Sequence, residues 1–98
     1  MEIIKNANGE ALTVKVVGRL DTTTAPSLEA ELKDSFDETD SLVLDFKDLE
    51  YVSSAGLRVI LMAQKTMSKK GGMRLINVNS VVMDVFEVTG FVDILTIE

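Results

Sequence analysis

The sequence contains no cysteine and no histidine among its 98 residues. The absence of cysteine excludes disulfide bonds and thiolate catalysis, and the absence of both residue types removes the usual zinc ligands. Without histidine, the chain also lacks the most common general base of enzymes. We therefore expect no metal site and no cofactor, and a catalytic serine would need a base of another kind.

Basic residues are scarce beside acidic ones. The chain has 10 lysines and arginines against 16 aspartates and glutamates, which gives a net charge of −6. A nucleic-acid backbone is bound by a surface rich in lysine and arginine, and an anionic membrane surface attracts the same residues. The charge balance therefore disfavours both, and we expect no nucleic-acid partner and no membrane partner.

Long apolar runs are missing as well. The longest uninterrupted one in the helical region is Val59–Ala63, whereas a membrane-spanning helix needs ~20 apolar residues. The first nine residues include Glu2 and Lys5 and lack the apolar core of a signal peptide. A length of 98 residues suits one domain. We expect a single cytoplasmic domain over residues 1–98 that is a monomer or a weak dimer.

The N-terminal part of the chain has the pattern of a β-hairpin. Asn8-Gly9 lies between two β-prone segments, and both positions tolerate a positive φ. In the second segment, Leu12, Val14 and Val16 alternate with other residues, so one face is expected to be buried.

The rest of the chain alternates between helical and strand patterns. Threonines 22–24 followed by Pro26 predict a helix start, and Leu42–Phe46 predicts a central strand. We expect a connecting loop at residues 47–53. The remaining predicted segments are a helix at Ala55–Lys70, a strand at Met73–Val78, a helix capped by Asn79 and ended by Gly90, and a last strand or tail at Phe91–Ile97.

This order predicts the α/β class, with an N-terminal hairpin, a mixed sheet of four to five strands and three to four helices. Binding sites of such sheets lie beyond the carboxyl ends of the strands. Asp21 follows the second predicted strand, and Ser53 and Ser54 follow the third. We expect these residues at the same edge of the sheet.

The serine pair directly precedes a predicted helix and has two compatible interpretations. A serine at this place is a good N-cap. The free N–H groups and the dipole of a helix start also favour negative charge, so a phosphate on Ser54 would be tolerated. Neither Ser-x-x-Lys from Ser53 or Ser54 nor Gly-x-Ser-x-Gly is present, which argues against hydrolase chemistry.

Residues 52–61, Val-Ser-Ser-Ala-Gly-Leu-Arg-Val-Ile-Leu, resemble the signature loop and helix of the STAS domain family, which includes the anti-sigma factor antagonists. Gly18–Asp21 is similar to the family's Gly-x-Leu/Ile-Asp before the first helix, and Leu42–Phe46 resembles its central strand. The resemblance covers essentially the whole chain. The family often has aspartate where this chain has Ser53, so one negative charge beside Ser54 is missing.

The resemblance implies a binding switch regulated by phosphorylation. The family's regulated serine corresponds to Ser54. Unphosphorylated, the chain would bind an anti-sigma factor that is also a serine kinase and so release the sigma factor, and a serine phosphatase would reverse the modification. No residue is expected to be catalytic. The expected partner-binding residues are Asp21, Ser53, Ser54, Ala55, Gly56 and Arg58.

Two other functions stay open. The chain can be a STAS adaptor or scaffold subunit of a transporter or signalling assembly, without regulation by phosphorylation. It can also be a small enzyme that uses Ser54 or the region of Asp21. Single residues have second interpretations too: Asp21 as a turn or N-cap residue, Gly56 as a residue tolerated at a helix start, and Arg58 as a solvated side chain.

Overall fold

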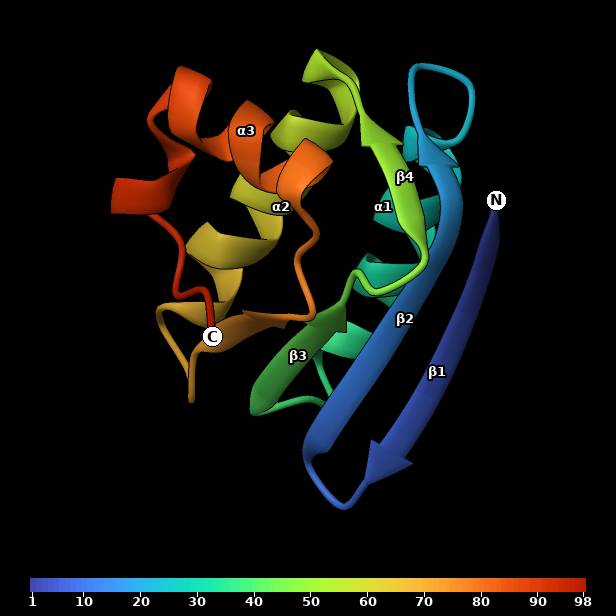
Figure 1. Ribbon diagram of the computed structural model, residues 1–98. Coiled ribbons are helices and arrows are strands. Elements are labelled where there is room, and N and C mark those ends of the chain that lie inside the picture. The colour runs from blue at the N-terminus through green and yellow to red at the C-terminus, as the bar shows by residue number, and fades with distance from the viewer.

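The computed structural model describes all of residues 1–98 and contains five strands and three α-helices (Figure 1). In chain order the elements are β1 (Glu2–Asn8), β2 (Ala11–Leu20), α1 (Ala25–Phe36), β3 (Ser41–Asp45), β4 (Leu49–Val52), α2 (Ser54–Met67), β5 (Met73–Ile76), α3 (Ser80–Thr89) and the 3-10 helix η1 (Phe91–Asp93). The predicted fold class, an α/β domain with an N-terminal hairpin and a mixed sheet, is confirmed.

The sheet is organised around β2, which is its longest strand. β1 pairs with β2 in antiparallel register, which confirms the predicted hairpin. Its turn lies one residue later than predicted, at Gly9-Glu10: Asn8 pairs with Ala11 as the last residue of β1, and Gly9 alone of the predicted Asn8-Gly9 pair has a positive φ. The other edge of β2 carries two parallel partners one after the other, β3 along residues 11–15 and β4 along residues 18–20. β5 extends the sheet beyond β3, also in parallel register (Figure 1).

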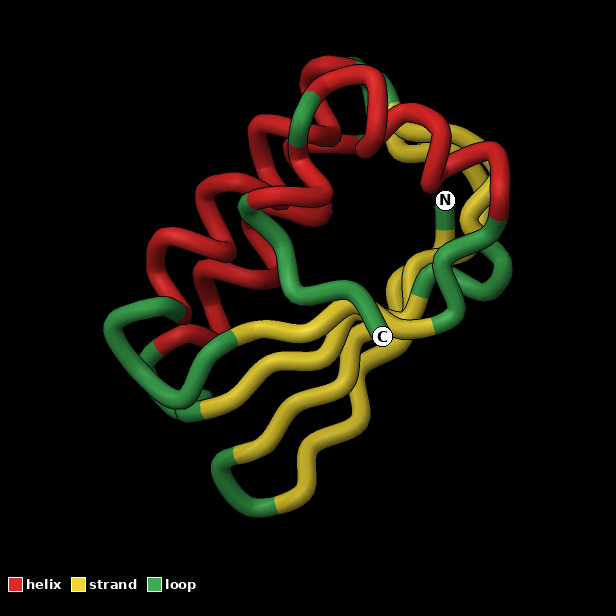
Figure 2. The backbone as a smooth tube through the Cα atoms, turned by 60° about the vertical axis from the view of Figure 1, so that its left-hand side comes forward, coloured by secondary structure: helices red, strands yellow, loops and turns green.

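The helices α1 and α2 cover the apolar face of this sheet (Figure 2). The alternation in β2 turns Leu12, Val14 and Val16 to the inside, where all three are buried. On the helices, Leu28 and Ile60 are fully buried and belong to the same core cluster of 22 residues. No helix of the chain is both long enough and apolar enough to span a membrane.

One prediction for the middle of the chain is wrong. Residues 47–53 were expected to form only a connecting loop, yet Leu49–Val52 is the strand β4. After β3 the chain makes a turn at residues 46–49, closed by a hydrogen bond from Leu49 N to Phe46 O of 3.1 Å. An ion pair of 2.9 Å between Lys15 on β2 and Asp48 fixes this turn to the sheet.

The ends of the later elements also differ from the sequence-based expectation. The helix predicted at Ala55–Lys70 begins one residue earlier, at Ser54, and ends at Met67. The predicted last strand is reduced to one parallel bridge between Leu75 and Ile97, which follows η1. Asn79 is the N-cap of α3, as predicted. Its side-chain oxygen accepts a hydrogen bond of 3.0 Å from Val82 N.

We predict that Asn79→Ala destabilises the domain by about 2 kcal/mol, because one side chain supplies both the α3 cap and a second hydrogen bond. That second bond, of 2.6 Å, runs from Asn79 Nδ2 to the backbone oxygen of Leu49 on β4. Urea unfolding measures the change, and Ser80→Ala at the next, exposed position is the control. An equal, small effect of both substitutions would contradict this double role.

Candidate functional site

The carboxyl ends of β2 and β4 meet at one edge of the sheet. Leu20 and Val52, the last residues of the two strands, are direct partners in the parallel register. The pairing continues one residue further, because Ser53 N donates a hydrogen bond of 2.9 Å to Leu20 O. Asp21 and Ser53 therefore leave the sheet side by side. The predicted common edge is present, although the serine pair follows β4 and not the strand β3.

Asp21 organises the turn between β2 and α1. Its Oδ1 accepts hydrogen bonds from the hydroxyl of Thr23 at 2.7 Å and from the backbone N–H groups of Thr23 and Thr24 at 3.0 and 3.2 Å. These bonds stabilise the carboxylate, so they hold the pKa of Asp21 below its usual value, and the Thr23 hydroxyl has the largest effect. The structure thus gives Asp21 the role of a turn residue beside the serine pair.

The threonine cap expected for α1 is only partly present. Thr24 occupies the N-cap position, but its side chain makes no capping bond. The hydroxyl donates to Arg19 O at 2.8 Å and accepts from Asp21 N at the same distance. Thr24 therefore ties the turn back to the end of β2, while the backbone oxygen of Asp21 receives the N–H of Ala25 at 2.8 Å.

The two serines have different environments. Ser53 is the N-cap of α2, with extended backbone at φ −95° and ψ 176°, and its Oγ accepts a hydrogen bond of 3.4 Å from Gly56 N. Ser54 is the first residue of the helix. Its side chain is exposed and its hydroxyl has no hydrogen-bond partner in the molecule. The fold therefore uses the hydroxyl of Ser53 and leaves that of Ser54 free.

Ser53 keeps the capping function that an aspartate would have at the same place, since both residue types are good N-caps. It does so without a charge. The first turn of α2 contains no acidic residue at all, so the positive end of the helix dipole is not offset by a carboxylate of its own.

Gly56 is buried, and packing within the domain leaves no room for a larger residue at this position. A Cβ at this position would lie 2.7 Å from Leu20 Cγ and 2.9 Å from a methyl carbon of Val52. The first turn of α2 thus rests directly on the ends of β2 and β4. Ala55 is half-buried, and Arg58 is exposed and takes part in no ion pair. Partner contacts by these three residues remain predictions.

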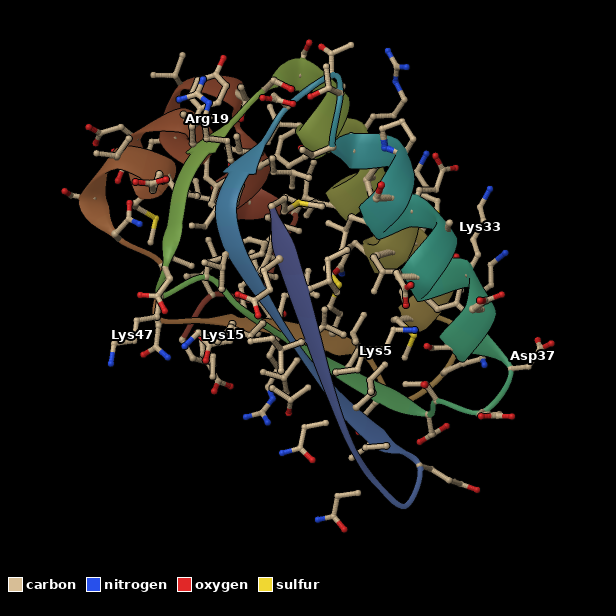
Figure 3. All side chains as sticks on the ribbon, turned by 90° about the vertical axis from the view of Figure 1, so that its right-hand side faces the viewer. Lys5, Lys15, Arg19, Lys33, Asp37 and Lys47 are labelled. Carbon is tan, nitrogen blue, oxygen red and sulfur yellow. The ribbon has the colours of Figure 1, made fainter.

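On the other face of the same strand ends, Arg19 stacks on Tyr51. The guanidinium carbon lies 4.3 Å from the centre of the ring, within the range of a cation–π contact. Figure 3 shows Arg19 at this end of β2, next to β4. The expectation that Tyr51 lies in a loop is wrong, since it is an exposed residue of β4. Sequence reasoning missed this pair, because it depends on the register of two strands that are neighbours in the sheet but far apart in the sequence.

The model of the STAS domain family matches residues 2–98 of this chain. The chain belongs to the STAS domain family. Its most similar relatives include BtrV of Bordetella bronchiseptica, 39% identical over 79 residues that cover 79% of this chain and 68% of that protein. They also include the anti-sigma-B factor antagonist of Bacillus subtilis, 31% identical over 91 residues that cover 92% and 84% of the two chains.

Solved structures agree with this STAS assignment. The crystal structure of an anti-sigma factor antagonist from Mycobacterium paratuberculosis has a TM-score of 0.88 at 22% identity, covering 98% of this chain and 83% of that one. Unphosphorylated SpoIIAA, an anti-sigma factor antagonist, has a TM-score of 0.84 at 17% identity, covering 99% and 88%. At these identities the structures show that the STAS domain shares their fold.

We predict that Ser53→Ala destabilises this STAS domain by about 1 kcal/mol, because it removes the α2 cap, whereas Ser53→Asp preserves stability. Ser54→Ala should change stability by less than about 0.5 kcal/mol, because its hydroxyl is exposed and unbonded. Urea unfolding of the three variants tests this assignment. A larger loss for Ser54→Ala than for Ser53→Ala would reverse the two roles.

Gly56→Ala is expected to destabilise the domain by about 1–3 kcal/mol, because the new methyl group overlaps Leu20 and Val52. Helix propensity alone predicts the opposite, a gain of about 1 kcal/mol. The sign of the stability change therefore shows whether the overlap with Leu20 and Val52 outweighs helix propensity. Thermal or urea unfolding measures it. Combining Gly56→Ala with Leu20→Ala should cost less than the sum of the two single changes, since the smaller side chain makes room for the methyl group.

Proposed function

We propose that this STAS domain is an anti-sigma factor antagonist controlled at Ser54. Unphosphorylated, the surface around Ser54 binds an anti-sigma factor that is also a serine kinase, and the sigma factor is released. The kinase transfers the γ-phosphoryl group of ATP to the Ser54 hydroxyl, and the complex dissociates. A serine phosphatase hydrolyses the phosphoester and restores the binding form.

The observation that carries this proposal is the free hydroxyl of Ser54. It is exposed at the first position of α2, while the neighbouring Ser53 provides the cap. A kinase can therefore modify Ser54 without breaking any bond of the fold. The similarity to the anti-sigma-B factor antagonist, at 31% identity over 92% of this chain, supports the same class of partner. SpoIIAA, a structural relative with a TM-score of 0.78, has been solved in a phosphorylated form.

The electrostatic change is large enough for a switch. A phosphate adds about −1.5 to −2 charges at neutral pH. Buried in an interface without paired donors, such a charge is costly, and a loss of about 3 kcal/mol lowers affinity more than a hundredfold. The fold need not change, because Ser54 already lies on the surface at the start of a helix.

The STAS adaptor is the nearest alternative, because Ser53 replaces the aspartate that the family often has before the regulated serine. The replacement is a weak argument against the antagonist function, since Ser53 preserves the cap that the aspartate would make. The enzyme hypothesis has less support. The Ser54 hydroxyl makes no hydrogen bond to any base in the chain. An esterase activity of the domain toward a generic ester, if it were lost in Ser54→Ala, would favour the enzyme hypothesis.

Phosphorylation should occur at Ser54 and be detectable as a single modified site. The protein is incubated with host lysate, ATP and a phosphatase inhibitor, and is then digested with trypsin. The peptide Asp48–Arg58 contains both serines, and fragmentation separates them. Phosphate on Ser54, absent in Ser54→Ala and retained in Ser53→Ala, supports the proposal. An unmodified peptide beside a labelled control substrate would favour the adaptor.

Ser54→Asp should fold normally and bind the anti-sigma factor of its host at least about tenfold more weakly, because it places one fixed charge in the interface. Ser54→Ala should bind as tightly as the unmodified protein. Calorimetric titration with the purified partner measures both. Equal affinity of all three proteins would contradict an electrostatic gate at this position.

A further inference from the structure

Half of the basic side chains of the domain are engaged in ion pairs. Five of the ten lysines and arginines pair with carboxylates at 2.7 to 3.8 Å. These five are Lys5, Lys15, Arg19, Lys33 and Arg74. Lys70 donates instead to the backbone oxygens of Phe36 and Thr39. The other four, Lys47, Arg58, Lys65 and Lys69, have no carboxylate or carbonyl partner.

Among these four, only Arg58 lies close to Ser54. Lys47 precedes β4, and Figure 3 shows it at the opposite end of that strand from Arg19. Lys65 is eleven residues beyond Ser54 on α2, about 16 Å along the helix axis, and Lys69 lies past the helix end. Arg19 lies at the same edge of the sheet as Ser54, but its guanidinium already contacts the ring of Tyr51 and the carboxylate of Asp21.

Arg58 stands four residues after Ser54 on the same helix. Residues with this spacing are neighbours on a helix surface, with Cβ atoms about 5–6 Å apart, and an acidic group on the N-terminal side of a basic one is the favourable order. The guanidinium of arginine matches phosphate oxygens with two parallel N–H donors. Both side chains are exposed, so no packing holds them apart.

We propose that Arg58 is the side chain that binds the phosphate group of phosphorylated Ser54. This inference rests on the proposed function, which makes Ser54 the modified residue. In the unphosphorylated domain, Arg58 is free to pair with a carboxylate of the anti-sigma factor. Phosphorylation then has two effects on the interface: it adds negative charge at Ser54 and it withdraws the positive charge of Arg58. The partner loses an attraction and gains a repulsion.

The test uses a protein in which phosphoserine is incorporated at position 54 during translation, so that no kinase or partner is needed. Phosphorus NMR follows the titration of the phosphate, whose second pKa is about 6 in the absence of neighbours. A nearby cation favours the dianion and lowers this pKa. Arg58→Gln should therefore raise it by about 0.3 units or more, and Arg58→Lys should raise it by less.

Lys65→Gln is the matched control, because it removes one exposed cation from the same helix, far from the phosphate. The other charged groups at this edge, Arg19 and Asp21 on the β2 side and Glu50 on β4, are the same in every variant. A shift in Arg58→Gln alone supports the pairing. Equal pKa values in Arg58→Gln and Lys65→Gln would overturn it.

The NMR titration and the lysate experiment can fail separately, so a failure of this inference is distinguishable from a failure of the proposed function. If lysate fails to phosphorylate Ser54, the antagonist switch is wrong, whereas the NMR titration still reports on the side-chain pair. If lysate modifies Ser54 but the titration is unaffected by Arg58, the switch stands and the role of Arg58 is wrong. In a second readout, Arg58→Gln should weaken binding of the unphosphorylated domain to its partner, and Lys65→Gln should leave it unchanged.

Discussion

The parallel pairing of β2 with β4 is the constraint on which the site depends. β2 shares one edge between two strands, and the last pair, Leu20 with Val52, lies where both end. The hydrogen bond from Ser53 N to Leu20 O extends this register to the first residue past β4. The turn of Asp21 and the start of α2 are thereby placed next to each other. The contacts of Asp48 with Lys15 and Gly18 hold only the turn before β4, so the position of Ser53 relative to Leu20 depends on β4 itself.

Local interactions then complete the site on this base. Gly56 lets the first turn of α2 approach Leu20 and Val52 closely, so the helix start is fixed by packing as well as by its cap. The Asp21 turn is held by hydrogen bonds that its own carboxylate accepts. Each of these groups has an internal partner. The Ser54 hydroxyl and the Arg58 guanidinium lack one, so modification or binding at these two groups breaks no bond of the native fold.

Much of this arrangement follows from local patterns. Alternating apolar residues predict β2, and the position of a serine before a helix predicts the cap. β4 escapes such reasoning because Glu50 and Tyr51 are adjacent exposed residues between buried Leu49 and Val52, so no alternation marks the strand. Its pairing includes a register shift at Gly18 and Arg19, and its partner lies about 30 residues away in the sequence. The same long-range register creates the Arg19–Tyr51 contact and the close packing of Gly56.

Ser53 determines how strongly a phosphate would change the site. Where an aspartate caps the helix, one carboxylate already offsets the positive end of the dipole, and a phosphate beside it would also meet like-charge repulsion. Here the cap is neutral and the first turn of α2 has no acidic residue. A phosphate on Ser54 would be the first negative group within the first turn of α2, beside free backbone N–H groups and four residues before Arg58, which we propose as its partner. A neutral Ser53 would therefore make a phosphate on Ser54 less unfavourable for the domain than an aspartate cap would.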